Sequence, residues 1–437
     1  MQSFQNATLC PWVPLLDRSH ADAALRSLAE VTEVLQNLDQ HREIDHEFRG
    51  QPFSLGSGGA GIALFFAYLE KSGLSLGARQ SAFEQMNRAI EAVASQYTGP
   101  SLYSGFTGVG WAAEHVTKLL SESGDDLNSD LDSALEQYVG TSPWKDDYDL
   151  ISGLAGVGVY CLERPGSPTA NHALELIVDR LYEMAERSED AVTWFTPPSL
   201  LIRMQTERYP EGFYNLGVAH GVPGVIALLG RTCSSGIAKE KASWLLERAV
   251  TWLLKQRLPA GASSSFADVI LPNGPQPNHC RLAWCYGDAG IAAALLLAAR
   301  CAGNPSWEEQ ALAIARRAAR RDPGTSGVTD ACVCHGSAGL AHIFNRIYQA
   351  THDELYADTA RYWLDRTLEF RDPAKGAAGY LTWGAGEKET VELQPKLGLI
   401  QGIAGIGLVL LAALSDVEPS WDRIFQMDVP PQPRLHA

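Results

Sequence analysis

Two short segments in the second half of the chain place cysteines beside another potential metal ligand. Cys285 stands in the segment WCYG, and Cys334 stands in CHG, where His335 follows it directly. Two sulfurs and one imidazole form a three-ligand set for Zn²⁺ with an open fourth position, which is typical of catalytic rather than structural zinc. The simpler interpretation is that both are small buried cysteines, which are common. The pattern favours zinc, with Cys280 and Cys332 as weaker ligand candidates because they lack equivalent positions.

Four further residues could move protons or stabilise charge near such a metal. His220 could transfer protons, Asp149 could orient a histidine, and Arg281 could stabilise a developing oxyanion. Each has a simpler interpretation: a hydrogen-bonded structural histidine, a helix cap for Asp149, a surface ion pair for Arg281 and aromatic packing for Tyr286. Beside a metal set, the simpler interpretations become less satisfactory for all four together.

The elements that must position these residues repeat along the chain. The signature Gly-x-x-Gly, followed by Val, Ile or Leu, occurs seven times. Each copy opens a run of small apolar residues, which suits a helix that is buried on all sides. An internal repeat of this kind decides the whole fold. The copies begin at Gly58, Gly105, Gly153, Gly221, Gly287, Gly336 and Gly402.

Amphipathic segments separate the signatures. In residues 174–185, apolar side chains recur at helical spacing and charged side chains take the other face. Similar patterns run through Ala21–Leu38, Gln80–Tyr97, Leu127–Tyr138, Ala238–Leu258, Trp307–Arg321 and Asp353–Phe370. Two kinds of helix therefore alternate, about fourteen in all, and stacking them buries the apolar surface that neither kind can bury alone. We predict an all-α fold, an α/α toroid with seven apolar helices inside and seven amphipathic helices outside.

The repeat also predicts where the candidate residues meet. A polar residue precedes each signature glycine, and all seven should point toward one end of the central cavity: Ser57, Ser104, Ser152, His220, Tyr286, His335 and Gln401. Serine is a common helix cap, whereas His, Tyr and Gln are poor caps. The last four repeats therefore differ from the first three at this position, which indicates another role on one side of the ring. Long loops on one face of a repeat protein mark its binding face. We expect a single domain, residues 1–437, with loops at about 188–219, 259–284 and 371–399 around the active-site mouth.

The composition narrows the class of protein. Apolar residues make up 46% of the chain and charged residues 20%, as in a globular protein with a large core. The net charge of −16 argues against nucleic-acid binding, which needs clustered Lys and Arg. The apolar stretches 290–299 and 402–414 are too short to span a bilayer, and residues 1–16 lack the pattern of a signal peptide. The sequence therefore predicts a cytoplasmic protein that does not span a membrane.

Together, these motifs resemble the LanC family of lanthipeptide cyclases over nearly the whole chain. The matching segments are YDLISGLAGVG, NLGVAHGVPG, RLAWCYGDAG, CHGSAGL and QGIAGIG, and the ordered combination of AHG, WCYG and CHG is the specific part. The WCYG segment resembles the bacterial cyclases. The chain is too short to hold a dehydratase or kinase domain as well, so it looks like the stand-alone type. The resemblance implies an α/α toroid with Zn²⁺ held by Cys285, Cys334 and His335, and active-site roles for Asp149, His220, Arg281 and Tyr286.

The resemblance also implies a reaction and partners. Such an enzyme adds cysteine thiols of a dehydrated precursor peptide to dehydroalanine or dehydrobutyrine, which closes lanthionine and methyllanthionine rings. His220, held by Asp149, would protonate the enolate; alternatively, either residue would deprotonate the incoming thiol, and the sequence leaves both roles open. A lanthipeptide dehydratase and an exporter are the expected partners, in a transient complex that would place the cyclase at the membrane surface. One alternative is a LanC-like enzyme that adds glutathione, but Tyr286 belongs to the bacterial-type motif and argues against it. Another alternative is a non-catalytic peptide-binding scaffold. A toroidal carbohydrate enzyme would need paired carboxylates, and Asp149 has no evident partner.

Overall fold

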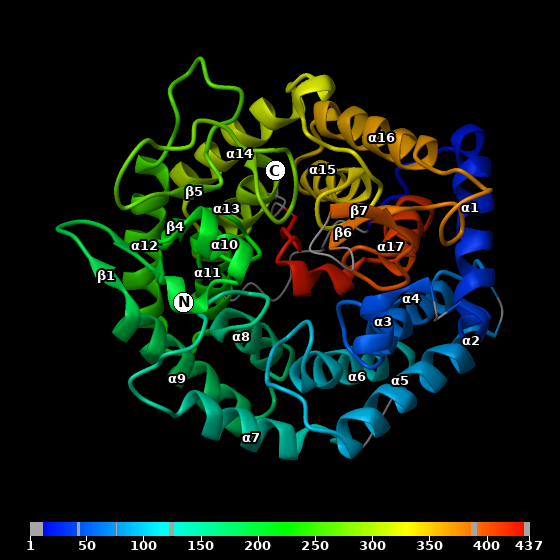
Figure 1. The fold of residues 1–437 in the computed structure, drawn as a ribbon, viewed down its shortest axis with the longest axis horizontal. Coiled ribbons are helices and arrows are strands. Elements are labelled where there is room, and N and C mark those ends of the chain that lie inside the picture. The colour runs from blue at the N-terminus through cyan, green and yellow to red at the C-terminus, as the bar shows by residue number, and fades with distance from the viewer. Residues whose placement is uncertain (1–11, 42–43, 76, 122–125, 386–390, 432–437) are drawn as a thin grey trace, which may run out of the picture.

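Inner and outer helices form a closed ring. The computed structural model describes residues 12–41, 44–75, 77–121, 126–385 and 391–431, and within them 14 long helices surround a central axis (Figure 1). The ring closes where α1 (Arg18–Gln36) packs against α17 (Ile403–Leu414). The predicted α/α toroid is confirmed. Residues 1–11, on which most of the signal-peptide prediction rests, lie outside the described residues.

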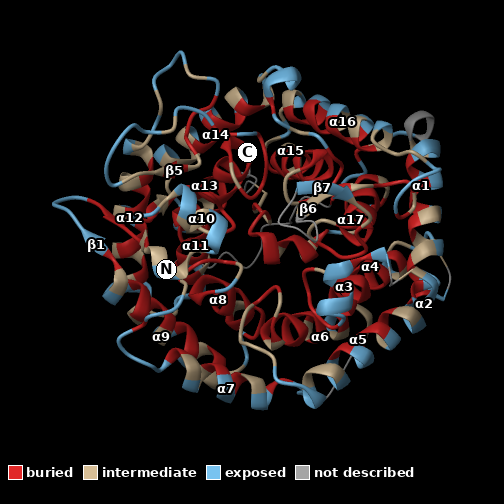
Figure 2. Ribbon diagram, in the orientation of Figure 1, coloured by how far each residue is buried: buried red, intermediate tan, exposed pale blue. Residues whose placement is uncertain are grey.

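Helices that are apolar on all sides line the inside of the ring. In α17, every residue from Ile403 to Ala413 is buried, and Figure 2 shows the inner helices buried along most of their length. Among the described helices, none combines the length and apolarity needed to cross a membrane. Besides α17, the inner helices are α4 (Gly59–Lys71), α6 (Phe106–Leu120), α8 (Leu154–Glu163), α11 (Val222–Ser235), α13 (Asp288–Ala302) and α15 (Ser337–Thr351).

Amphipathic helices form the outside of the ring. In α9 (Pro168–Met184), Leu174, Ile177 and Leu181 lie on one buried face, as their helical spacing predicts. The exposed faces of the outer helices point away from the ring (Figure 2). The predicted amphipathic segments overlap all of them. Besides α1 and α9, the outer helices are α5 (Ala78–Ser95), α7 (Ser129–Val139), α12 (Lys239–Lys255), α14 (Pro305–Ala319) and α16 (Glu354–Glu369).

The long connections contain short strands and helices that the sequence patterns did not reveal. The strands are two to four residues long, too short to show the alternation by which strands are recognised. They form two hairpins, β1–β2 and β6–β7, and a sheet of order β3–β4–β5. These elements are β1 (Glu186–Arg187), β2 (Val192–Thr193), β3 (Phe195–Thr196), β4 (Phe213–Asn215), β5 (Val269–Ile270), β6 (Thr382–Ala385), β7 (Val391–Gln394), α2 (Leu38–His41), α3 (His46–Gly50), α10 (Arg203–Arg208), η2 (Pro198–Leu200), η3 (Pro323–Thr325) and η4 (Ser420–Phe425).

The second glycine of the signature is required because a backbone carbonyl lies too close to it for any side chain. A Cβ at Gly290 would lie 2.0 Å from the carbonyl oxygen of Trp284, and a Cβ at Gly339 would lie 1.9 Å from that of Val333. No side chain fits at such a distance, because non-bonded carbon contacts have their optimum near 3.5–4.0 Å. Each of these inner helices therefore begins directly against the backbone six residues earlier, which fixes the loop in between.

Backbone hydrogen bonds join the loops before the inner helices to one another. Cys285 N–H donates to the carbonyl of Cys334 (3.2 Å), and Cys334 N–H donates to that of Ile400 (3.0 Å). In each bond the donor precedes its signature glycine by two or three residues, and the acceptor precedes the signature glycine of the next repeat by two. We call these bonds the mouth ring. Its other members run from Ile400 to Gly56, from Gly56 to Tyr103, from Leu150 to Ala219 and from Ala219 to Cys285.

The 3-10 helix η4 fills the centre of the ring (Figure 1). Trp284 Nε1 donates a hydrogen bond to the carbonyl of Phe425 (2.8 Å), and the Tyr103 hydroxyl donates one to the carbonyl of Ile424 (2.8 Å). Both aromatic residues stand in loops before inner helices. The end of the described chain therefore supports these loops from inside the ring.

Candidate active site and metal centre

The residues before the signature glycines meet in one cavity. The cavity has a volume of about 390 Å³ and takes its walls from loops on several sides of the ring. Cys285 and Cys334 line it. Five of the seven residues that directly precede a signature glycine line it too: Ser57, Ser104, His220, Tyr286 and Gln401. Equivalent positions of the repeat thus face the same space.

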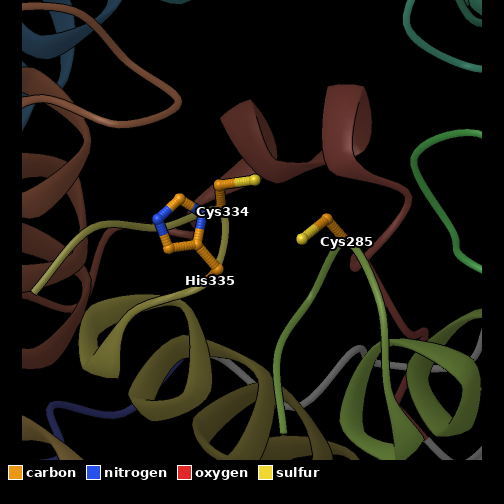
Figure 3. Close-up of side chains that lie close together, drawn as sticks. All are labelled: Cys285, Cys334 and His335. Atoms are coloured by element: carbon orange, nitrogen blue, oxygen red, sulfur yellow. The ribbon is translucent and has the colours of Figure 1, made fainter. Parts of the chain in front are cut away.

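Cys285, Cys334 and His335 lie close enough together to hold a metal ion. Their ligand atoms all lie within 4.8 Å of one another, and the two sulfur atoms point toward each other (Figure 3). Cys285 comes from the loop before α13, and the other two come from the loop before α15. The mouth-ring bond between Cys285 and Cys334 holds these loops side by side. Two neighbouring repeats therefore build one potential metal centre.

A hydrogen bond joins the thiols of Cys285 and Cys334. This bond is the main reason that the pKa of Cys285 lies well below its ordinary value, and it raises the pKa of Cys334. A cation bound between the two sulfur atoms would favour both thiolates, and thiolates with imidazole suit borderline and soft divalent metals. The chemistry of this donor set fits a metal.

Asp330 is a residue of the site that the sequence patterns did not reveal. Its Oδ2 lies 3.1 Å from Nε2 of His335 and accepts a hydrogen bond from the Trp383 N–H (3.1 Å), while Oδ1 accepts one from the Cys332 N–H (3.1 Å). Because the carboxylate takes Nε2, the other ring nitrogen of His335 is left for a metal. Asp330 stands six residues before a signature glycine, a position that is also polar in four other repeats, and that recurrence is the signal that could have found it: Asp147, Asn215, Arg281 and Lys396.

A second group of potential ligands overlaps the first. Asp330, Cys332 and His335 also have ligand atoms within 4.8 Å of one another. Cys332, however, is fully buried, whereas Cys285 and Cys334 line the cavity. The carboxylate of Asp330 already accepts two backbone hydrogen bonds. The first group is therefore the better metal centre, with Asp330 as the outer partner of its histidine.

Replacing Asp330 by asparagine should weaken metal binding without removing a ligand. Loss of such an outer partner typically costs about 10- to 100-fold in metal affinity, because the histidine is no longer held in one orientation and loses basicity. Competition between the protein and a chelator for zinc would measure the change. Asp322→Asn, an exposed carboxylate in the same connection, is the control and should keep the wild-type affinity. Equal affinities for both variants would leave Asp330 only the role of anchoring the backbone.

His220 and Asp149 form a hydrogen-bonded pair at the cavity wall. Nδ1 of His220 lies 2.5 Å from Oδ2 of Asp149, and Oδ1 of Asp149 accepts hydrogen bonds from the N–H groups of Ser152 (2.7 Å) and Gly153 (3.0 Å). The carboxylate is buried, whereas the imidazole side chain is 42% exposed. Burial favours the neutral ring, but the hydrogen bond and charge of Asp149 outweigh it and raise the pKa of His220. This geometry leaves Nε2 as the nitrogen that can exchange a proton in the cavity.

We expect Asp149→Asn to lower the pKa of His220. Asparagine can still accept the hydrogen bonds of Ser152 and Gly153, but it lacks the charge that stabilises the imidazolium. In the wild type, the raised pKa stabilises the fold below the ordinary value of 6.5, and this contribution is lost as pH rises through the folded pKa. An NMR titration of the His220 ring would show the fall. Asp146→Asn, an exposed neighbour, should change nothing, and an unmoved pKa in the Asp149 variant would contradict the pairing.

Tyr286 lies against the same pair. Its hydroxyl accepts a hydrogen bond from Nδ2 of Asn215 (2.9 Å), and its ring centroid lies 6.4 Å from that of His220. Burial raises the pKa of Tyr286, so the phenol stays protonated at neutral pH. Tyr286 can therefore donate a hydrogen bond but cannot supply a phenolate. Asn215, at the end of β4, is a second residue that sequence reasoning missed.

Arg281 occupies a different place from the other predicted residues. It is exposed, and it is not among the described residues that line the cavity. Its positive charge is nevertheless near enough to contribute to the low pKa of Cys285. The structure thus brings five of the seven predicted site residues to the cavity or the metal centre, holds Asp149 against His220, and places Arg281 at their edge.

A lysine that the sequence did not single out lies in the cavity wall. Lys396 is buried, and its ammonium lies 2.8 Å from Oε1 of Glu47 and 3.9 Å from Oδ1 of Asp45. All three line the cavity. They belong to segments some 350 residues apart in the chain, so no local pattern could have paired them. The cavity wall therefore also carries a cation with two carboxylates beside it.

Comparisons with known proteins agree with this architecture. Residues 50–426 match the family model described as lanthionine synthetase C-like protein. A relative named nisin biosynthesis protein NisC, from Lactococcus lactis subsp. lactis, is 24% identical over 406 residues, which cover 87% of this chain and 90% of the relative. A solved structure named nisin cyclase superposes with a TM-score of 0.73 at 20% identity, covering 91% and 97% of the two chains, and shows the shared fold. The chain belongs to the lanthionine synthetase C-like family.

Proposed function

We propose that the protein is a zinc-dependent lanthionine synthetase. It closes thioether rings in a dehydrated precursor peptide by adding cysteine thiols to dehydroalanine or dehydrobutyrine. The observation that carries the proposal is the meeting of Cys285, Cys334 and His335 with the His220–Asp149 pair around one cavity. The family, the relative named for nisin biosynthesis and the structural neighbour named nisin cyclase support the same reaction.

Zinc suits the donor set better than a hard cation does. Cys285 and Cys334 as thiolates and His335 as neutral imidazole balance the charge of a divalent ion and leave one of four positions open. When bound, zinc would supply acidity, because a substrate thiol with a free pKa of about 8.5 is deprotonated on coordination. The cavity side of the group, where both cysteines are reached, is the side from which the substrate thiol arrives.

The protein's own side chains handle the charge and the proton that the addition moves. The substrate sulfur forms a bond to the β-carbon, the double-bond electrons shift to the carbonyl oxygen, and the α-carbon then takes up a proton. His220 donates that proton from Nε2, because the hydrogen bond and charge of Asp149 raise the pKa of the ring and so favour the imidazolium. The positive ends of the inner helices and the charge of Arg281 stabilise the enolate oxygen.

The wider setting is also part of the proposal. The substrate is a dehydrated precursor peptide with leader and core, presented in a transient complex with a dehydratase and an exporter in the cytoplasm. The chain works as one toroidal domain whose long connections surround the cavity. The comparisons support a peptide cyclase over a glutathione-adding enzyme or a non-catalytic scaffold.

A synthetic peptide with one dehydroalanine and one cysteine tests the activity directly. Ring closure leaves the mass unchanged but removes the thiol, so alkylation with N-ethylmaleimide separates substrate from product. We expect the zinc-loaded protein to abolish alkylation much faster than the peptide cyclises alone. Added glutathione should not appear as an adduct. A thiol that stays alkylatable at the uncatalysed rate would reject the cyclase, and a glutathione adduct would favour the alternative enzyme.

A further inference from the structure

A second cavity lies at the end of α14, away from the metal centre. It has a volume of about 640 Å³ and is lined by four arginines and by one acid, Asp322. The arginines stand at the last turn of α14 and just beyond it, where positive charge is favoured by the helix dipole. We call them the arginine cluster: Arg316, Arg317, Arg320 and Arg321.

The four arginines have two carboxylates near them, Asp322 in the cavity wall and the buried Asp288, so the arginine cluster keeps a net positive charge. Arg317 donates to the carbonyl of Ala262, and Arg321 donates to that of Cys280 (2.7 Å), so these two bind backbone rather than carboxylates. The other two are exposed. Within the described part of the chain, none of the four forms an ion pair, and Nε of Arg321 is buried without a partner. The chain as a whole has a net charge of −16, so this local positive charge is unusual and would attract an anionic ligand.

The arginine cluster is close to the catalytic loop. Cys280, whose carbonyl Arg321 holds, precedes Cys285 by five residues, which span no more than about 18 Å even when fully extended. The inner helices begin at the mouth, and the outer helices run the opposite way, so α14 ends on the mouth side of the ring. A peptide whose cysteine reaches Cys285 can therefore place a neighbouring segment over the cluster.

We propose that the arginine cluster binds an acidic segment of the peptide substrate and so anchors it beside the mouth; this rests on the proposed function. Guanidinium groups match the planar carboxylates of Asp and Glu through paired hydrogen bonds. An extended polyphosphate such as RNA is disfavoured because the overall negative charge of the protein repels a long polyanion. Because the distance to Cys285 is at most about 18 Å, about five extended residues are enough to connect the acidic segment with the reacting cysteine.

Peptide binding tests this proposal without any turnover. Two fluorescent peptides share one cysteine-containing core and differ only in a flanking segment, with Asp and Glu in one and Asn and Gln in the other. Anisotropy should show that the wild-type protein prefers the acidic peptide by about tenfold, and that salt weakens the preference. Arg316→Gln combined with Arg320→Gln should abolish the preference and leave binding of the neutral peptide unchanged.

A matched control separates local binding from general charge. Arg26→Gln combined with Arg88→Gln removes the same charge from exposed positions on α1 and α5, and should keep the preference. Equal binding of the two peptides to wild type, or equal losses in both double variants, would overturn the proposal. Thermal stabilisation by inorganic phosphate in the wild type alone, with no peptide preference, would instead make the cluster a phosphate site. A protein that prefers the acidic peptide but closes no ring would fail only the proposed function.

Discussion

Cys334→Ala is expected to remove the bound zinc and the cyclase activity together while the ring stays folded. The substitution takes one of three ligands, and the loss should exceed the about 10- to 100-fold that an outer partner costs. The fold should survive because the backbone N–H and carbonyl of Cys334 remain in the mouth ring. Elemental analysis of purified protein, circular dichroism and the alkylation assay would measure the three properties in one preparation. Wild type should hold about one zinc per chain.

The control for this experiment is another thiol. Cys301→Ala removes a partly buried cysteine from α13, outside the metal group, and should keep zinc and activity. If the Cys334 variant still held one zinc, the metal would be assigned instead to the overlapping group of Asp330, Cys332 and His335. A folded wild type without metal, purified in the absence of chelators, would remove the basis of the mechanism.

His220→Ala should slow ring closure by about 10²- to 10⁴-fold, the usual contribution of a general acid, without loss of zinc. The ring of His220 belongs to the cavity wall, but it lies outside the metal group, so metal content is the readout that separates this variant from Cys334→Ala. The pH profile of the rate should also differ between the wild type and the variant. In the wild type, activity should fall as pH rises through the raised pKa of His220, and this limb should be missing from the variant.

Two further results would decide what His220 does. Asp149→Asn should move the falling limb to lower pH, because the imidazolium loses the charge that stabilises it. Ring closure in deuterated water should place deuterium on the α-carbon at a rate that His220 controls. Unchanged rates in both variants would mean that solvent protonates the enolate and that the pair only shapes the cavity.

The fold and the grouping of the three potential metal ligands could be predicted from the sequence because both depend on local patterns. Gly290 and Gly339 are demanded by contacts with backbone only six residues away, so the signature survives in every repeat. The inner and outer helices differ in periodicity within single segments. Cys285 and Cys334 could be matched because they hold equivalent positions in adjacent repeats, and the mouth ring turns that equivalence into contact.

Other parts of the site depend on contacts that form only in the tertiary structure. Asp330 gains its role because β6 brings the N–H of Trp383 to the same Oδ2 atom that lies beside Nε2 of His335. Lys396 meets Glu47 across the closure of the ring. The exposed position of Arg281 also depends on how its loop folds, and residue type and spacing do not specify that.

The mouth ring has a consequence for motion. Its six bonds run in one sense around the axis, each N–H donating to the next repeat, so each amide dipole can polarise its neighbour. No loop in this chain can swing outward without breaking a bond to the loop beside it. The donor amides of Cys285, Cys334 and Ile400 should therefore exchange their hydrogens slowly and as one cooperative unit. The six bonds link the seven loops in one run from Leu150 to Tyr103, and Cys285 and Cys334 lie in the middle of that run, so bonds on both sides hold the spacing of the two sulfur atoms.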